Sequence, residues 1–180
     1  MPLTRKQRAL VKELREIYDL FSIDFYDIAD YGREERTVRL ELMRNKVIRA
    51  EVVIKYVLVD EFLNGELADH FFGQNSSYIR LWKTKKFRHF NYHILEELSL
   101  MQKLRYVKSL RKIPKSVSAD IDRLNSLRNG IAHAFFPENL RKSQPVWKGR
   151  NIFTLEGAKA FEEDIGAVTD FFVRIRHGRR

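Results

Sequence analysis

The chain contains no cysteine, which excludes disulfides, thiolate nucleophiles and every zinc site that depends on cysteine. A chain without cysteine suits a reducing compartment, so we expect a cytoplasmic protein. Residues 1–7 lack the apolar core of a secretory signal peptide. The longest stretch without Asp, Glu, Lys or Arg is ten residues, 70–79, whereas a helix needs about 20 residues to span a bilayer. We therefore expect a soluble protein with no membrane partner.

Glycine is also scarce, and its spacing excludes several nucleotide sites. No two of the eight glycines are closer than eight residues, so neither a Gly-x-Gly-x-x-Gly fingerprint nor a Walker loop is present. The Gly-x-Ser-x-Gly elbow of hydrolases is missing as well. His89, His93 and Glu97 have the i, i+4, i+8 spacing of ligands on one helical face, but no fourth ligand accompanies them. The sequence therefore predicts neither a metal nor a cofactor.

Acidic residues are outnumbered by basic ones, 24 against 34, which gives a net charge of +10. Since 44% of the residues are hydrophobic, this charge is carried by a chain that can still fold. The length of 180 residues fits one domain over residues 1–180. The charge is concentrated in residues 77–119, which hold 11 basic and two acidic residues.

The basic segment 77–119 also contains six aromatic residues. Cations bind phosphates and aromatic rings stack on bases, so this composition predicts contact with single-stranded nucleic acid. Alternatively, the segment is a solvated helix face whose aromatic residues are simply core. The candidate RNA-binding residues are Lys83, Lys86, Arg105, Lys108, Arg111 and Lys112, and the aromatic residues are Tyr78, Trp82, Phe87, Phe90, Tyr92 and Tyr106.

Apolar residues recur at helical spacing along most of the chain, which predicts an all-α bundle of about five helices. A Lys-Gly-Arg-Asn turn between apolar pairs predicts a short β-hairpin at 146–153, before the last helix. The helix-forming stretches are 4–21, then 34–73 with Leu40, Met43, Val47, Ile54, Leu58 and Phe62 as its apolar stripe, 78–90, 94–113, 117–136 and 154–175. Residues 22–33 and 74–77 read as a loop and a linker.

One arginine occupies an unexpected position in the helix over 117–136. At about 100° per residue, Arg128 falls in the apolar row that holds Ile121, Leu124 and Ile131. An unpaired guanidinium there is costly, so we expect an acidic partner or an anion. Glu51 lies within the predicted apolar stripe of the second helix, and the sequence therefore predicts a buried pair between Glu51 and Arg128.

On the same helix, Asn129 and His133 fall in one polar quadrant. The pattern Arg128-Asn129-x-x-x-His133, late in a small all-α chain, resembles the Arg-x4-6-His signature of the HEPN superfamily. This resemblance covers roughly residues 35–175. It implies a metal-independent endoribonuclease that acts as a homodimer and leaves 2′,3′-cyclic phosphate and 5′-hydroxyl ends. It also implies the roles of the residues: His133 is a general acid or base, Arg128 holds the scissile phosphate, and Asn129 makes a polar contact.

The resemblance implies a toxin or phage-defence setting, with an antitoxin protein as a partner. Two alternatives remain open at this point. The first is a non-catalytic helical module that binds RNA, a nucleotide or a partner protein. The second is a purely structural dimer in which the polar motif fixes helix packing.

Overall fold

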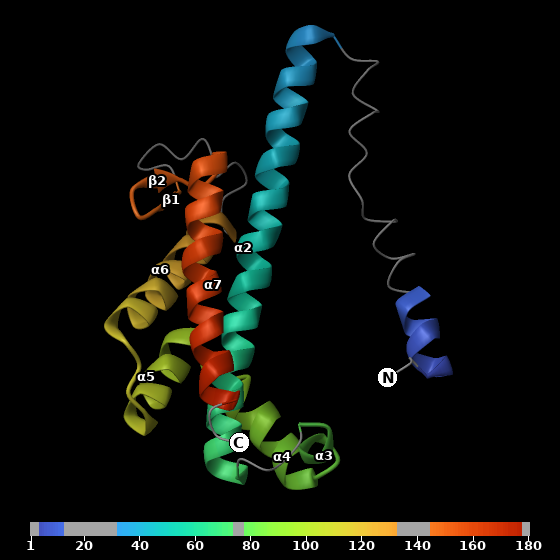
Figure 1. Cartoon of the computed structure of the whole chain (residues 1–180), viewed down its shortest axis with the longest axis vertical. Coiled ribbons are helices and arrows are strands. Elements are labelled where there is room, and N and C mark those ends of the chain that lie inside the picture. Colours follow the sequence, from blue (N-terminus) through green and yellow to red (C-terminus); the bar gives the residue numbers. More distant parts are fainter. Residues whose placement is uncertain (1–3, 13–31, 74–77, 133–144, 178–180) are drawn as a thin grey trace. The chain divides into compact units, whose positions relative to one another are not determined.

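The computed structural model describes residues 4–12, 32–73, 78–132 and 145–177. In this part of the chain all regular elements are helical except for one two-stranded sheet, which confirms the predicted all-α class with a hairpin before the last helix (Figure 1). After a helical segment at 5–12, the elements are α2 (Arg33–Phe72), α3 (Tyr78–Trp82), α4 (Lys85–Phe90), the π-helix η2 (Asn91–Leu95), α5 (Leu100–Leu110), α6 (Lys115–Ala132), β1 (Val146–Trp147), β2 (Arg150–Asn151) and α7 (Leu155–His177). None of the described helices combines the length and apolar character that a bilayer span requires.

The chain divides into two compact units, Met1–Arg44 and Asn45–Arg180, where the sequence predicts one domain. In the first unit a capping box opens the helical segment at 5–12. Thr4 Oγ1 accepts from the backbone N–H of Gln7 at 3.3 Å, and Gln7 Oε1 accepts from the N–H of Thr4 at 2.8 Å. This start is as predicted, whereas residues 13–31 lie outside the described residues.

The long second helix is confirmed, but the stripe predicted to face the core is confirmed only in part. Its β-branched stretch 52–59 is helical, and Gly73, with φ of +86°, follows its last residue as a left-handed C-terminal glycine does. Its core face carries Val52, Val59 and Leu63, whereas Val47 and Ile54 are exposed. The prediction is wrong at Leu40, Val47 and Ile54, because α2 is apolar on two faces and helical periodicity cannot tell which of them is covered. Phe62 of the same stripe packs against the core, and Leu58 is half-buried.

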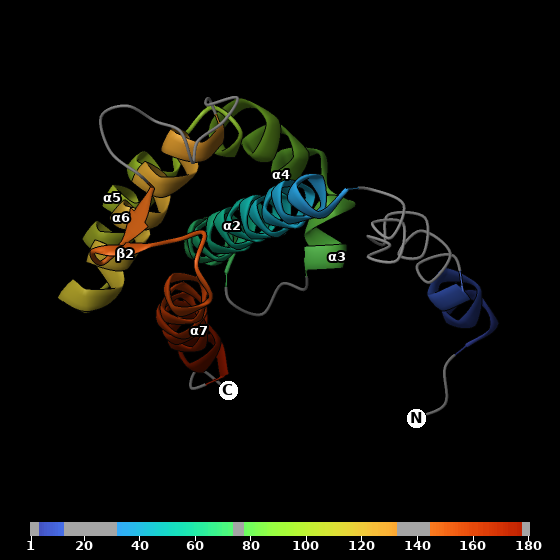
Figure 2. The same ribbon diagram turned by 90° about the horizontal axis from the view of Figure 1, so that it is seen from above.

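Within the second unit, α2 is surrounded by the other helices on several sides (Figure 2). It meets α7 through a Lys55–Glu162 ion pair of 2.7 Å, and it meets α5 through Lys103 and Asp60, also at 2.7 Å. Helices α6 and α7 each bury one apolar face whose residues recur at helical spacing. These faces are formed by Val117, Ile121, Leu124 and Ile131 on α6, and by Phe161, Ile165, Val168 and Phe172 on α7.

An aromatic cluster joins α4 to the C-terminal turn of α2. The ring of Phe72 lies 5.3 Å from that of Phe87 and 5.2 Å from that of Phe90, centroid to centroid. Phe87 and Phe90 are buried, so for these two the core alternative holds. Trp82 and Tyr92 remain exposed, and Tyr78 is among the side chains that the structure leaves undescribed.

The helix predicted over 94–113 is wrong in its first part. A π-turn, in which the N–H of Glu96 donates to the Asn91 carbonyl at 3.0 Å, ends before the helix α5 begins. A second capping box starts α5: Ser99 Oγ accepts from Gln102 N–H, and Gln102 Oε1 accepts from Ser99 N–H. The Ser-x-x-Gln signal is readable in the sequence, but the apolar period continues through it.

The hairpin forms as predicted and lies against α6 and α7. Val146 pairs with Asn151 and Trp147 with Arg150, and the turn places Lys148 at φ 45° and Gly149 at φ 83°. Two successive positive φ values are typical of a type I′ turn, which suits the twist of paired strands. Thr154 then caps α7, since its Oγ1 accepts from the N–H of Gly157 at 3.1 Å.

Candidate nucleic-acid interface

A groove of about 680 Å³ runs between α5 and α6. Its walls carry three cationic side chains, Arg105 and Lys108 from α5 and Lys115 from α6, together with Asp122 and the hydroxyl of Ser118. Apolar side chains from both helices form its floor. The groove therefore combines an open shape with a cationic rim.

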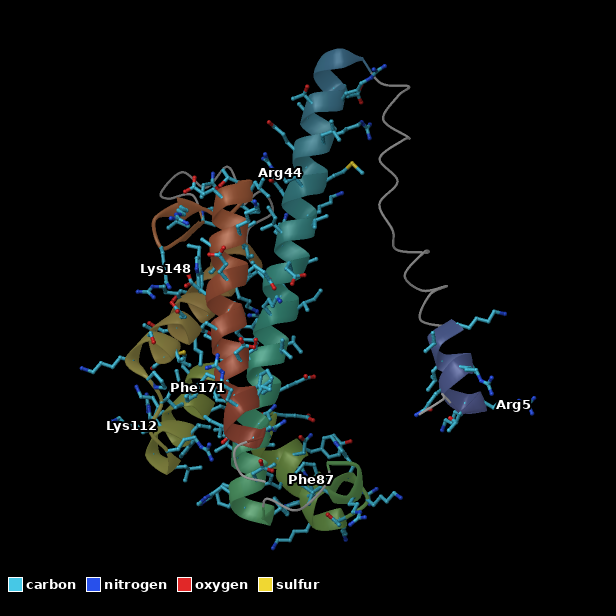
Figure 3. All side chains as sticks on the ribbon, in the orientation of Figure 1. Arg5, Arg44, Phe87, Lys112, Lys148 and Phe171 are labelled. Carbon is cyan, nitrogen blue, oxygen red and sulfur yellow. The ribbon has the colours of Figure 1, made fainter. Side chains whose placement is uncertain are left out.

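Among the described residues, the cations of the groove form no ion pair with a carboxylate. Lys108 Nζ donates to Ser118 Oγ at 3.3 Å across the groove, a contact that leaves its charge uncompensated. In the described ranges no carboxylate forms an ion pair with Arg105, Lys108 or Lys115. Lys112 is exposed at the outer edge of the same helix pair (Figure 3). This surface is thus open to an anion from outside the chain.

Two other cations of the basic segment, Lys103 and Arg111, point inward and form ion pairs with carboxylates of α2. Lys103 is 5% exposed, and its Nζ donates to both oxygens of Asp60 at 2.7 and 2.8 Å. Arg111 Nε lies 2.8 Å from Oε2 of Glu66, a carboxylate that is almost fully buried. The sequence predicts that Arg111 binds RNA, but the structure assigns its guanidinium to the contact between α5 and α2. Sequence position alone cannot reveal this, because Arg111 and Lys112 are neighbours with opposite surroundings.

Lys83 and Lys86 lie away from the groove. Lys83 is exposed in the turn between α3 and α4, and Lys86 Nζ sits 5.6 Å from the centre of the Phe72 ring. Both therefore belong to a second cationic surface near the end of α2. His89 and His93 lie close by, with ring centroids 4.4 Å apart. Within the described ranges no group of three His, Asp or Glu side chains gathers to hold a metal ion.

Arg128 does not pair with Glu51, which corrects the expected buried ion pair. The Glu51 carboxylate lies 3.5 Å from Lys55 Nζ, and its side chain is 46% exposed. The pair fails because the stripe around Glu51 is the exposed face of α2, while the core face presents Tyr56 to α6. Arg128 Cζ lies 5.0 Å from the centre of the Tyr56 ring, as in a cation–π contact.

The surroundings of Arg128 leave its charge available to an anion. Its Nη1 donates to Oδ1 of Asn129 at 3.1 Å, and no carboxylate of the described residues is paired with it. Burial raises the pKa of Tyr56, the positive charge of Arg128 acts in the opposite direction, and Asp60 adds to the rise. The ring therefore stays a neutral phenol under the guanidinium near neutral pH, and it contributes no negative charge to neutralise it.

Asn129 connects Arg128 to the groove face of α6. Ser118, Asp122 and Asn129 recur at four- and seven-residue spacing, which places them on one side of the helix. The rise from Ser118 to Asn129 is about 16 Å at 1.5 Å per residue. His133, the predicted general acid or base, lies outside the described residues. The structure thus places Asn129 at one end of the side of α6 that lines the groove, while the adjacent Arg128 faces Tyr56 of α2.

The hairpin fixes α6 against α7 through a cluster of charges. Lys148 Nζ lies 3.1 Å from Asp120 Oδ1 on α6 and 2.8 Å from Asp164 Oδ1 on α7, and Trp147 Nε1 donates to Asp164 Oδ2 at 2.7 Å. Burial acts to raise the pKa of Asp164, but the hydrogen bonds from Lys148 and Trp147 outweigh it and lower this pKa. The hairpin therefore holds the helix that carries Arg128 and Asn129 in place.

Comparisons with known proteins give no relative to set beside this geometry. No protein-family model, no curated protein and no solved structure matches the chain.

Proposed function

We propose that this protein binds single-stranded RNA and cleaves it as a metal-independent endoribonuclease of the HEPN type. The observation that carries the proposal is the state of Arg128: a half-buried guanidinium lies on a neutral tyrosine ring beside Asn129, with no carboxylate of the described residues neutralising it. A guanidinium in this state can hold a phosphate by two parallel hydrogen bonds. The cationic groove along the same helix supports the choice of a polyanion.

The proposed reaction needs no metal. His133 takes the proton of a ribose 2′-OH, and the 2′-oxygen attacks the neighbouring phosphorus. The bond from phosphorus to the 5′-oxygen breaks, and the 5′-oxygen takes a proton from water as it leaves, while His133 returns its proton to solvent. Arg128 stabilises the charge that builds on the phosphate, and Asn129 orients the guanidinium. The products are a 2′,3′-cyclic phosphate and a 5′-hydroxyl, and DNA is no substrate because it lacks the nucleophile.

The proposal includes a homodimer, since Arg128 and His133 are about 140° apart on a regular helix. An exposed apolar face on α2 supports it. Val47, Ile54 and Val57 recur at seven- and three-residue spacing on this face, the spacing of a seam between two helices, and Ile54 is 57% exposed. Ile54→Lys is therefore expected to convert dimers to monomers in light scattering, while a matched surface change, Lys46→Gln, leaves the mass unchanged. A toxin or defence setting with an antitoxin is part of the same proposal.

The central test is cleavage without metal. The full chain is incubated with mixed single-stranded RNA in excess EDTA, beside His133→Ala, Arg128→Ala and the control Arg174→Ala, which changes an exposed arginine on α7. We expect cyclic-phosphate ends from the wild type and the control, and none from the other two variants. Cleavage that persists in both His133→Ala and Arg128→Ala would refute the proposed chemistry.

A second candidate, RNA binding without cleavage, is favoured by one specific observation. The groove cations Arg105, Lys108 and Lys115 lie on helices α5 and α6 and do not depend on His133. Intact RNA that binds with an affinity falling steeply with salt would support this module and contradict the nuclease. Absence of binding, with a loss of several kcal/mol of stability in Arg128→Ala, would favour a structural role for the motif.

A further inference from the structure

A second hollow lies on the other side of α5 from the cationic groove. It has a volume of about 380 Å³ and is lined by Leu67 and Phe71 of α2, Ile94 of η2, and Tyr106, Ser109 and Leu110 of α5. Its lining is almost entirely apolar, and its size falls within the range of small-ligand sites. Neither Arg128 nor Asn129 lines it.

The rim of this pocket is unusually apolar for a surface. Phe71 is 59% exposed and Tyr106 is 53% exposed, and Ile94 and Leu110 are exposed beside them. Four large apolar side chains gathered at one opening form the kind of patch that marks a binding site. A single exposed apolar residue would need no such explanation.

The charges of α5 indicate what kind of ligand this pocket receives. Arg105 directly precedes Tyr106, and Lys108 directly precedes Ser109, so each cation is about 100° around the helix from a pocket residue. Arg105 and Lys108 face the groove, while Tyr106 and Ser109 face the pocket. Helix α5 is therefore a ridge with cations on one side and an aromatic pocket on the other.

We propose that this pocket receives an unstacked base of the single-stranded RNA whose phosphates lie on Arg105 and Lys108. The inference rests on the proposed RNA binding and adds to it the position at which one base is bound. A strand crossing the ridge would place phosphates on one side and the base on the other, with the base stacked on the Tyr106 ring. This is the combination that proteins use to bind single strands, because every base has an aromatic face.

The chemistry of the lining predicts how the base is recognised. The only polar side-chain groups there are the hydroxyls of Ser109 and Tyr106, and the Ser109 hydroxyl already donates to the Tyr106 carbonyl at 2.7 Å. Few donors and acceptors can therefore read the edges of a base. We expect the pocket to bind all four bases through stacking and burial, with little sequence preference.

The test compares one tyrosine inside the pocket with one outside it. Tyr106→Ala removes the stacking face, whereas Tyr92→Ala removes an equally exposed tyrosine that does not line the pocket. Fluorescence anisotropy gives the Kd for a labelled single-stranded RNA and for an oligomer of the same length with abasic ribose units. To report binding alone, both oligomers carry 2′-O-methyl groups, which prevent cleavage.

We expect Tyr106→Ala to weaken binding of the normal oligomer about tenfold, the effect of one lost base stack. The abasic oligomer should bind wild type and Tyr106→Ala equally, and Tyr92→Ala should match the wild type with both. Tyr106→Phe should keep the wild-type Kd because it keeps the ring. The salt dependence should be unchanged in all three variants, since no charge is removed.

Two results would overturn the inference, and they are distinguishable from failure of the proposed function. If Tyr106→Ala keeps the wild-type Kd while Arg105→Gln/Lys108→Gln binds more weakly, RNA binding stands and the pocket serves another occupant, such as an apolar side chain of a partner protein. Equal weakening for normal and abasic oligomers would show that Tyr106 does not contact a base. If the wild type binds no RNA, the proposed function itself fails and the inference fails with it.

Discussion

Helix α5 carries basic side chains on two sides, and in the part of the chain that the structure describes those on one side form ion pairs with carboxylates of α2 while those on the other side do not. On the side facing α2, Lys103 and Arg111 are held by Asp60 and Glu66. On the groove side, Arg105, Lys108 and Lys115 form no ion pair with a carboxylate of the described residues, although Asp122 lines the same groove. Lys103 and Arg111 compensate a half-buried and a buried carboxylate inside the protein, whereas the cations on the groove side are available to an external anion. A net charge therefore identifies a candidate surface only after the internal ion pairs are subtracted.

The largest expected effect breaks the inner pair. Lys103→Met leaves Asp60 without its cation, and removing one partner of a buried pair costs about 3 kcal/mol of unfolding free energy. Chemical denaturation measures this loss, and RNA affinity of the folded fraction should not change. In the double variant Lys103→Met/Asp60→Asn much of the loss should return. A single variant as stable as the wild type would mean that the inner pair contributes nothing.

The next largest effect distinguishes Arg111 from its sequence neighbour Lys112 by their contributions to stability. Arg111→Met is expected to cost about 2 kcal/mol of stability, because it leaves the buried carboxylate of Glu66 without its charged donor. Lys112→Met, one residue further along on the exposed side, should unfold at the same denaturant concentration as the wild type. The same measurement serves both variants. Equal midpoints for the two would contradict the division between inner and outer cations.

The outer cations are expected to affect binding and not stability. Arg105→Gln/Lys108→Gln removes two phosphate contacts, so the slope of log affinity against log salt should decrease by about 1.4 for a single strand. Titrations of labelled RNA at several salt concentrations give this slope. The unfolding midpoint should stay at its wild-type value. A slope equal to that of the wild type would exclude these two residues from the interface.

The smallest expected effect concerns the hairpin, whose Lys148 is a third kind of cation, paired at the surface. The pKa of Asp164 is lowered in the folded chain, so this carboxylate stabilises the fold at pH values above the usual carboxyl pKa. The stabilisation is lost as the pH falls through that range. Between about pH 5 and pH 3 the wild type should lose more thermal stability than Asp164→Asn, which lacks the contribution at every pH. If the melting temperatures of both proteins fall equally over this pH range, the cluster around Lys148 makes no pH-dependent contribution to stability.

Much of the fold could be predicted because its signals are local. Thr4 and Gln7, the Lys148-Gly149 turn and the Thr154 cap each fix a boundary through contacts between residues close in sequence. The buried faces of α6 and α7 agree with periodicity, since each of these helices has one apolar stripe.

The candidate site was harder to predict because its contacts are long-range. The sequence correctly identifies Arg128 as a charge in an apolar row, but its neighbour is Tyr56 and not Glu51. The error arises on α2, which offers two apolar faces, and only tertiary packing decides which one is covered. The groove could not be predicted for the same reason. Lys103 and Arg105 are close in sequence but lie on different sides of one helix, and only the packing of α5 shows which of them faces α2.

The π-turn at η2 has a consequence for the length of this segment. It accommodates one residue more than an α-helical ladder would, and Ile94, at the pocket rim, lies within it. Deleting a single residue from 91–95 would restore the α-helical ladder and leave the downstream chain in nearly the same orientation relative to α4. Chains descended from a common ancestor with this one could therefore differ by one residue here and still keep α5 in place. In an alignment of such chains, a gap of one position within 91–95 would identify those in which the rim of the apolar pocket near Ile94 is built differently.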